Sequence, residues 1–182
     1  MNNKLSLPRL VAMVVAFIAI VTFFLPYISA TDEYREYMSS RSEEKPIEGT
    51  DITVGDMMDM SLFEYARTYY QGGEAIFRSS GSGVFYGVLI SAIAGFALLT
   101  LLAAWHKRPI LTLICDLMMG GAFYLVNWDF VDRGIMPDSD RVWAIAYHLY
   151  YPLAAVIAVC AIWMFVVKRR MKKAAEQPQS QP

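Results

Sequence analysis

The sequence predicts an all-α integral membrane protein, a bundle of four transmembrane helices with a short amphipathic helix in the first extracellular loop. Three observations lead to this fold class. Hydrophobic residues make up 56% of the 182 residues and the mean hydropathy is +0.35, which is more apolar than a typical soluble domain. These residues lie in four long runs, and the excess of positive charge lies on one side of them.

Each apolar run is close to the length of about 20 residues that a helix needs to cross a hydrocarbon core of about 30 Å. Only Asp116 and His148 interrupt their apolar character. Helices are expected because lipid offers backbone groups no hydrogen-bonding partner, and because the runs lack the alternation of barrel strands. The expected spans are residues 10–28, 84–105, 110–126 and 142–167.

The distribution of charge predicts that both termini are cytoplasmic, because cytoplasmic flanks collect Lys and Arg. The side that holds the termini carries nine cations and one carboxylate. The two loops on the other side carry seven cations and fifteen carboxylates. We therefore expect a multi-pass protein of the plasma membrane, in contact with the lipid bilayer, whose formal net charge of −1 conceals a basic side and an acidic side.

The first run also has features of a cleaved secretory signal, namely a basic start and a small residue at Ala30. Its apolar stretch is longer than the 7 to 15 residues usual in signals, and Ile28 is bulky where a small residue is preferred. Cleavage would leave three spans and an external N-terminus, and this alternative stays open.

The first outer loop, residues 29–82, divides into two parts. Residues 31–55 are rich in charge, and we expect them to be loosely packed. From Asp56, which can cap a helix, apolar residues recur at helical spacing until Gly72 and Gly73. This pattern predicts an amphipathic helix that lies on the membrane surface, covers the bundle, or simply packs within the loop.

The remaining segments complete a single membrane domain over residues 1–173. Residues 106–109 are a short link, so the second and third spans should form an antiparallel hairpin. Residues 127–141 are expected to be the second outer turn. Residues 174–182 are low in complexity, and we expect a disordered cytoplasmic tail.

Asp116 is the residue whose expected place costs the most free energy, roughly 2.5–3.5 kcal/mol on insertion scales. Thr112 and Gly120 lie four residues on either side of it and so share its helix face. Thr100 lies at a similar depth on the preceding span. We predict a protonated or hydroxyl-bonded carboxyl. Its function would be that of a proton or cation relay, and the structural alternatives are a hydrogen bond between helices or a carboxylate that snorkels towards the membrane surface.

A second candidate site lies at the outer end of the fourth span, around Tyr147, His148 and Tyr151. Pro152 follows directly, and its missing amide hydrogen frees the carbonyl of His148 and favours a kink. Together with aromatic residues of the third span, this turn has the composition of a small pocket for a lipid or apolar ligand. The alternative is an aromatic belt at the membrane interface.

A third feature is a stripe of small residues on the second span. Gly83, Gly87, Ser91 and Gly95 recur at every fourth position, which gives a groove where another backbone can approach closely. Such a groove serves packing within the bundle or the formation of a dimer.

No cofactor or metal is expected from the residue types present. Cys115 and Cys160 are the only cysteines, and both lie within spans, where they can be neighbours at similar depth or separate packing residues. The two histidines belong to opposite membrane faces and cannot be paired axial ligands of a haem. The outer aspartates lack the spacing of a calcium loop. Nothing in the sequence points to nucleic-acid binding.

Three short stretches carry a family resemblance, namely FLPYISA at residues 24–30, SLFEYARTYY at 61–70 and IWMFVVKRR at 162–170. They resemble uncharacterised small four-span membrane proteins of gut-type Gram-positive bacteria. The resemblance implies the four-span topology and a bacterial source. It implies no activity and no functional residues.

These observations favour a non-enzymatic accessory or interaction subunit, which acts through its acidic outer loop and its glycine-lined second helix on a membrane protein or on a second copy. Motifs for nucleotide, zinc or nucleophilic chemistry do not occur in the sequence. The alternative is a small proton- or cation-coupled transporter or channel component that uses Asp116. A third hypothesis is a membrane enzyme that acts on lipid substrates with His148 and the outer aspartates.

Overall fold

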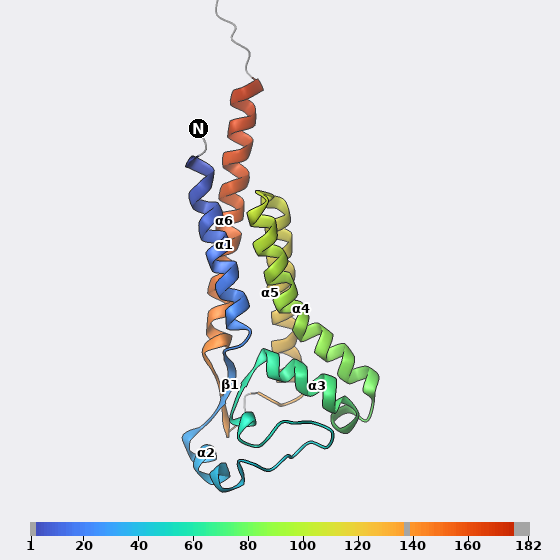
Figure 1. Cartoon of the computed structure of the whole chain (residues 1–182). Helices are drawn as coiled ribbons and strands as arrows, with labels where there is room; N and C mark the ends of the chain where they lie inside the picture. The colour runs from blue at the N-terminus through green and yellow to red at the C-terminus, as the bar shows by residue number, and fades with distance from the viewer. Residues whose placement is uncertain (1–2, 137–138, 177–182) are drawn as a thin grey trace, which may run out of the picture.

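The computed structural model describes residues 3–136 and 139–176 (Figure 1). This part of the chain is mainly helical and carries one small sheet. The α-helices are α1 (Asn3–Thr22), α2 (Asp32–Met38), α3 (Leu62–Phe77), α4 (Ser80–Trp105), α5 (Pro109–Asp132) and α6 (Ile145–Glu176). The strands are β1 (Pro26–Ala30), β2 (Asp59–Ser61) and β3 (Arg141–Trp143), and the 3₁₀ helices are η1 (Ser39–Arg41) and η2 (Asp56–Met58).

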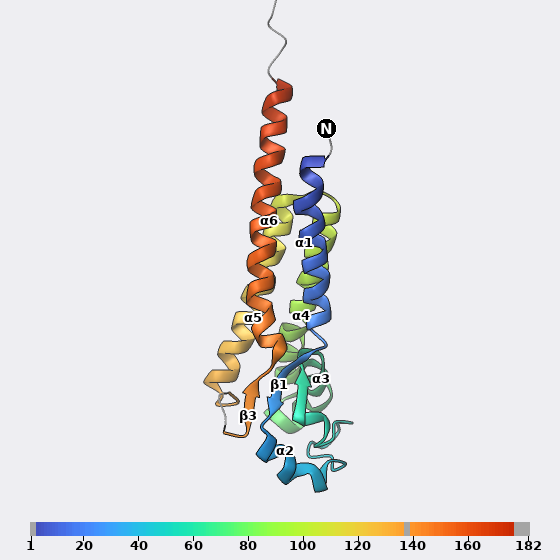
Figure 2. The same cartoon turned by 90° about the vertical axis from the view of Figure 1, so that its left-hand side faces the viewer.

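The four long helices run lengthwise and pack side by side (Figures 1 and 2). Helix α1 packs on α4 and α6, and α5 packs on the same two helices. We call the end where α1 begins and α6 ends the basic end. The opposite end carries β1–β3, α2, α3, η1 and η2, which together we call the head.

Three of these helices are long and apolar enough to cross a membrane, as expected for a helical membrane protein. They are Gly81–Trp105, Pro109–Asp132 and Ile145–Ala174. The apolar part of α1 extends only over Ser6–Thr22 and is shorter. The structure therefore shows a helical protein with three helices of spanning length among the described residues, and a fourth span is a proposal to which we return below.

The helix boundaries of α1, α5 and α6 differ from the expected spans. Helix α1 ends at Thr22, and residues 26–28 of the first expected span belong to β1, because Pro26 cannot donate a backbone hydrogen bond and Tyr27 and Ile28 are buried in the head. Helix α5 continues to Asp132, so the first part of the expected turn 127–141 is helical.

Helix α6 also differs from the prediction at both of its ends. Residues 142–143 of the fourth expected span lie in β3, and the helix begins at Ile145. At its other end it continues to Glu176, so the start of the tail that was predicted to be disordered is helical. Residues 177–182 lie outside the described part of the chain.

A three-stranded antiparallel sheet joins segments that are far apart in the sequence. The strand order is β2-β1-β3, with Ile28 of β1 paired with both Met60 and Trp143. Strand β1 follows α1, β2 leads into α3, and β3 leads into α6. The sheet therefore lies where α1 enters the head, where α3 begins within it and where α6 leaves it, as Figure 2 shows.

Helix α3 is the expected amphipathic helix, but its ends differ from the prediction. Ser61 caps it, since the Glu64 amide donates to Ser61 Oγ at 3.2 Å and the Ser61 amide donates to Glu64 Oε2 at 2.7 Å, a capping box. Asp56 does not cap this helix and lies in η2. Gly72 and Gly73 do not end it, because both are buried where α3 meets its neighbours and the helix continues to Phe77.

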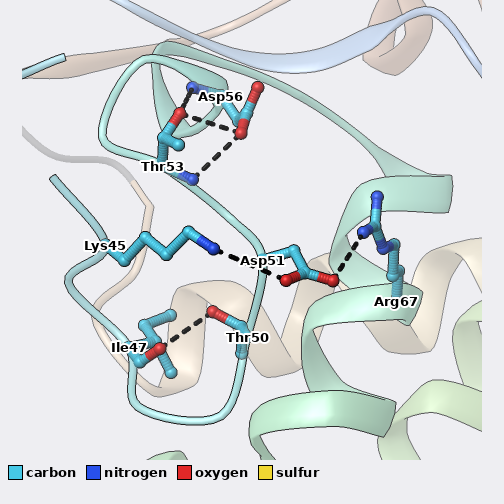
Figure 3. Close-up of polar contacts among 7 residues, drawn as sticks. All are labelled: Lys45, Ile47, Thr50, Asp51, Thr53, Asp56 and Arg67. Atoms are coloured by element: carbon cyan, nitrogen blue, oxygen red, sulfur yellow. Dashed lines mark hydrogen bonds and ion pairs between the residues drawn. The ribbon is translucent and has the colours of Figure 1, made fainter. Parts of the chain in front are cut away.

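The charge-rich segment 31–55 is packed against the rest of the head, which corrects the expectation of a loose loop. Ile52 and Val54 are buried. Asp51 pairs with Lys45 at 3.5 Å and with Arg67 of α3 at 3.4 Å, as Figure 3 shows. A loose loop was expected because charged residues dominate the composition of this segment. Its few apolar residues are nevertheless enough to pack it against the rest of the head.

Candidate functional site

Asp116 lies inside the helical bundle with only 2% of its surface exposed. Its Oδ1 has no hydrogen-bond partner among the described residues, and the same holds for the buried Thr100 Oγ1. Thr112, one turn before Asp116, donates its hydroxyl to the carbonyl of Arg108 at 3.0 Å. The hydroxyl bond that the sequence suggested for Asp116 is therefore not formed by either threonine in the structure.

An unpartnered buried carboxyl is costly, because a polar group removed from water loses its hydrogen bonds without compensation. Gly120, on the same face of α5, has nothing within 4 Å of where a side chain would begin. The stripe on α5 thus combines a buried acid with an open glycine, and no described side chain forms a hydrogen bond with Asp116 Oδ1.

The aromatic turn of α6 is a packed cluster in the structure. Tyr147 stacks on Trp143 with ring centroids 4.2 Å apart. The hydroxyl of Tyr151 accepts a hydrogen bond from Asn127 Nδ2 at 2.9 Å, while His148 is exposed. Helix α6 continues through Pro152 as one helix. The structure therefore brings the two tyrosines into packing roles and does not group His148 with a nucleophile or an orienting carboxylate.

Sequence reasoning missed a buried polar pair at this level. Tyr27 is fully buried, and its hydroxyl donates to Asn127 Oδ1. The Tyr27 ring lies edge-on to Tyr65, Phe123 and other rings from α3, α5 and β3. Tyr27 and Asn127 are 100 residues apart in the sequence, and no local pattern around either residue indicates that they meet.

The glycine stripe of α4 is largely occupied by the chain itself. A Cβ at Gly73 of α3 would lie 2.7 Å from the Cα of Gly83, and a Cβ at Gly87 would lie 2.9 Å from the ring of Tyr70. The Tyr70 hydroxyl also lies 3.5 Å from Ser91 Oγ. Only Gly95 has open space beside it. The close backbone approach expected for this stripe is made by α3, so three of its four positions are covered.

An arginine enclosed by aromatic rings holds the head to the helices. The guanidinium carbon of Arg133 lies 4.6 Å from the ring centre of Tyr86 and 5.3 Å from that of Phe77, with Tyr69 and Phe130 within 6 Å. Asp129 forms an ion pair with the same guanidinium. Cation–π contacts of this kind contribute about 0.5–2 kcal/mol each, depending on desolvation. Arg133 therefore links α3, α4 and α5.

The far tip of the head is formed by α2, which has no buried residue and lies at the opposite end of the molecule from the chain start (Figure 1). Tyr37 is 73% exposed, and Glu33 and Glu36 are exposed beside it. Glu33 and Tyr37 are four residues apart and so share one helix face. We call Glu33, Glu36 and Tyr37 the tip patch.

The tip is held in place by bonds to the sheet. The Thr31 amide donates to the carbonyl of Asp140 at 2.9 Å, and Arg35 donates two hydrogen bonds to Asp59, at 2.7 and 2.8 Å. The Arg35 guanidinium holds the pKa of the Asp59 carboxyl below its usual value. The patch is therefore presented by a fixed helix and not by a free loop.

Cys115 and Cys160 are both free and buried, and they have different surroundings. Cys160 packs with Ala12, Ala104 and Met164, whereas Cys115 borders a groove between α4 and α5. Within the described residues, no group of three or more His, Cys, Asp and Glu side chains is arranged to hold a metal ion.

Comparison with known proteins gives no family for this chain. No family model matches it, and neither the characterised proteins nor the solved structures contain a significant match. The function must therefore be argued from the chain's own residues.

Proposed function

We propose that this protein is a non-enzymatic, multi-pass protein of the plasma membrane that acts as an accessory subunit by binding another protein through its head. In this proposal α1 is a fourth span, and both termini are cytoplasmic, in keeping with the segregation of charge. The packing of α1 on α4 and α6 supports its place beside the spanning helices.

The observation that carries the proposal is the tip patch on a folded head. Tyr37 is 73% exposed on this patch, and aromatic residues are enriched at the centres of protein interfaces. Tyr37 follows Glu36 directly and lies one helical turn after Glu33, so a partner of this patch would present a basic surface with an apolar contact. A second copy of this acidic surface would repel it, which favours a different protein as the partner.

The glycine-lined helix loses its role as a partner surface in this proposal. Helix α3 covers Gly83, Gly87 and Ser91, which leaves Gly95 alone in open space. Deleting the outer loop would therefore also remove the packing of α3 on α4, and a loss of binding after such a deletion would be uninformative. Point substitutions on the tip are the sharper test.

In the experiment, the full chain is purified from native membranes in a mild detergent. The proteins that co-purify with it are then identified, and their stoichiometry is measured. The variant carries Glu33→Lys, Glu36→Lys and Tyr37→Ala. The control carries Glu48→Lys and Glu74→Lys, because both carboxylates are exposed and Gly49 beside the first lies against Gln71 of α3, on another part of the head. We expect a stoichiometric partner that the tip variant loses and the control keeps. A partner kept equally by both variants, or none at all, contradicts the proposal.

A second candidate function rests on the unpartnered Asp116 carboxyl. An ionisable side chain that is buried among membrane helices suggests a functional role by default. Here Asp116 Oδ1 and Thr100 Oγ1 are both buried, and neither atom has a hydrogen-bond partner among the described residues. A small proton- or cation-coupled transporter component would use this acid. Proton flux into liposomes that contain the full chain, compared with the Asp116→Asn variant at equal protein content, separates the two functions. Equal flux would exclude the relay.

A further inference from the structure

An apolar groove lies at the basic end between the first turns of α5 and the last turns of α6. Its volume is about 740 Å³, within the 300–1,000 Å³ of typical ligand sites. The apolar wall consists of Ile110, Leu111 and Ile114 from α5 and Phe165 from α6, all of which are more than a third exposed. The groove therefore has the size and surface that accept a hydrocarbon chain.

Cations from two separate elements stand along the same groove. Arg108 precedes α5, while Lys168, Arg169 and Lys172 lie on α6. Within the described residues, Arg108, Lys168 and Arg169 form no ion pair with a carboxylate. The combination of an apolar wall with the charges of Arg108, Lys168 and Arg169 fits a ligand that has an anionic group at one end and an acyl chain at the other.

The level of the groove along the helices agrees with that ligand. Helix α6 has 32 residues and is therefore about 48 Å long, more than the roughly 30 Å of a hydrocarbon core, so its last turns extend past the link between α4 and α5 (Figure 1). Trp105 and Trp163 are exposed near this end, where tryptophan marks the headgroup level. In the sequence, Arg108 follows Trp105 and the α6 cations follow Trp163. The apolar wall lines the same groove as these cations.

We infer that this groove binds an anionic phospholipid of the surrounding membrane, with its phosphate between Arg108 and the α6 cations and an acyl chain along Ile114 and Phe165. Basic pockets between helices on the cytoplasmic side are the usual setting for such headgroups. This site differs from general attraction between basic residues and a negative membrane surface. Here one phosphate would be contacted from both sides of the groove, by Arg108 before α5 and by the cations of α6. The inference is independent of any partner protein at the head.

The test titrates dioleoyl phosphatidylglycerol into the full chain in a non-ionic detergent and counts bound lipid by native mass spectrometry, with phosphatidylcholine in parallel. The groove variant is Lys168→Gln with Arg169→Gln. The control is Arg170→Gln with Lys173→Gln, which removes the same charge from the same helix at positions that do not line the groove. We expect phosphatidylglycerol to bind in preference to phosphatidylcholine, and the groove variant to bind it roughly 10- to 30-fold more weakly.

A second pair of variants tests the apolar wall without changing charge. Ile114→Trp fills the groove, whereas Ile162→Trp places the same ring at an equally exposed position of α6 outside it. We expect only Ile114→Trp to lose lipid. Equal losses in both charge variants, equal binding of the two lipids, or displacement of the lipid by inorganic phosphate at millimolar concentration would each overturn the inference.

Discussion

Gly73 of α3 and Gly83 of α4 touch through their backbones, and neither position has room for a side chain. A Cβ at Gly73 would lie 2.7 Å from the Cα of Gly83, and a Cβ at Gly83 would lie 2.6 Å from the carbonyl oxygen of Tyr69. This contact joins the head to the helical bundle. It also means that a motif typical of helix association is used here within one chain.

Gly83→Ala should therefore lower stability, because backbone atoms cannot move aside as a flexible side chain would. We expect a loss of about 1–3 kcal/mol, the usual cost of overpacking. Gly95→Ala is the matched control on the same helix, since nothing lies within 4 Å of it and alanine is the better helix former. Thermal unfolding in detergent measures both, and an unchanged midpoint for Gly83→Ala would show that α3 does not pack on α4 as described.

Tyr27→Phe should also be destabilising, although it removes a single oxygen. The change leaves Asn127 Oδ1 buried without its donor, which costs about 1–3 kcal/mol. Tyr151→Phe removes the other partner of Asn127, but Tyr151 is 44% exposed, so water can replace it and the loss should be smaller. Chemical denaturation of both variants gives the comparison, and equal losses would contradict the assignment of Tyr27 as the more important partner.

Arg133→Lys keeps the positive charge and removes the planar group that faces four rings. We expect a loss of about 1–2 kcal/mol, because an ammonium cannot stack on several rings at once. Arg78→Lys is the control, since Arg78 is exposed. Limited proteolysis of the head, followed by mass spectrometry, should show faster cleavage between α3 and α4 only for Arg133→Lys. Identical cleavage patterns would exclude a holding role for this arginine.

The ion pair between Arg35 and Asp59 predicts a small dependence of stability on pH. The Arg35 hydrogen bonds lower the pKa of Asp59, so the pair adds stability above the unfolded pKa of about 3.9, and this contribution is lost as the pH falls through the lower folded value. Because both side chains are about 40% exposed, the contribution should stay below about 1 kcal/mol.

The measurement compares the unfolding midpoints of the natural chain and Asp59→Asn at pH 7 and near pH 3. The variant should be slightly less stable at pH 7, and the difference should shrink at the lower pH. Asp32→Asn is the control, because Asp32 is exposed and forms no ion pair among the described residues. A difference that grows on acidification would have the wrong sign and would contradict the role of Arg35.

The sequence by itself predicted a helical protein and located three helices that are long and apolar enough to cross a membrane, because apolar runs of about 20 residues match the thickness of a hydrocarbon core. It also located Asp116 in a buried place and predicted the amphipathic helix that became α3. These are properties of local composition and spacing, and they do not depend on which distant segments meet.

Only the tertiary structure decided how the head is built. Strands of three to five residues carry too little pattern to be recognised, and Ile28 finds Met60 and Trp143 only when the chain has folded. The same holds for Gly73 against Gly83 and for the rings around Arg133. Whether a small residue, an aromatic ring or a cation is free for a partner depends on which part of the same chain covers it, and a linear pattern does not contain that information.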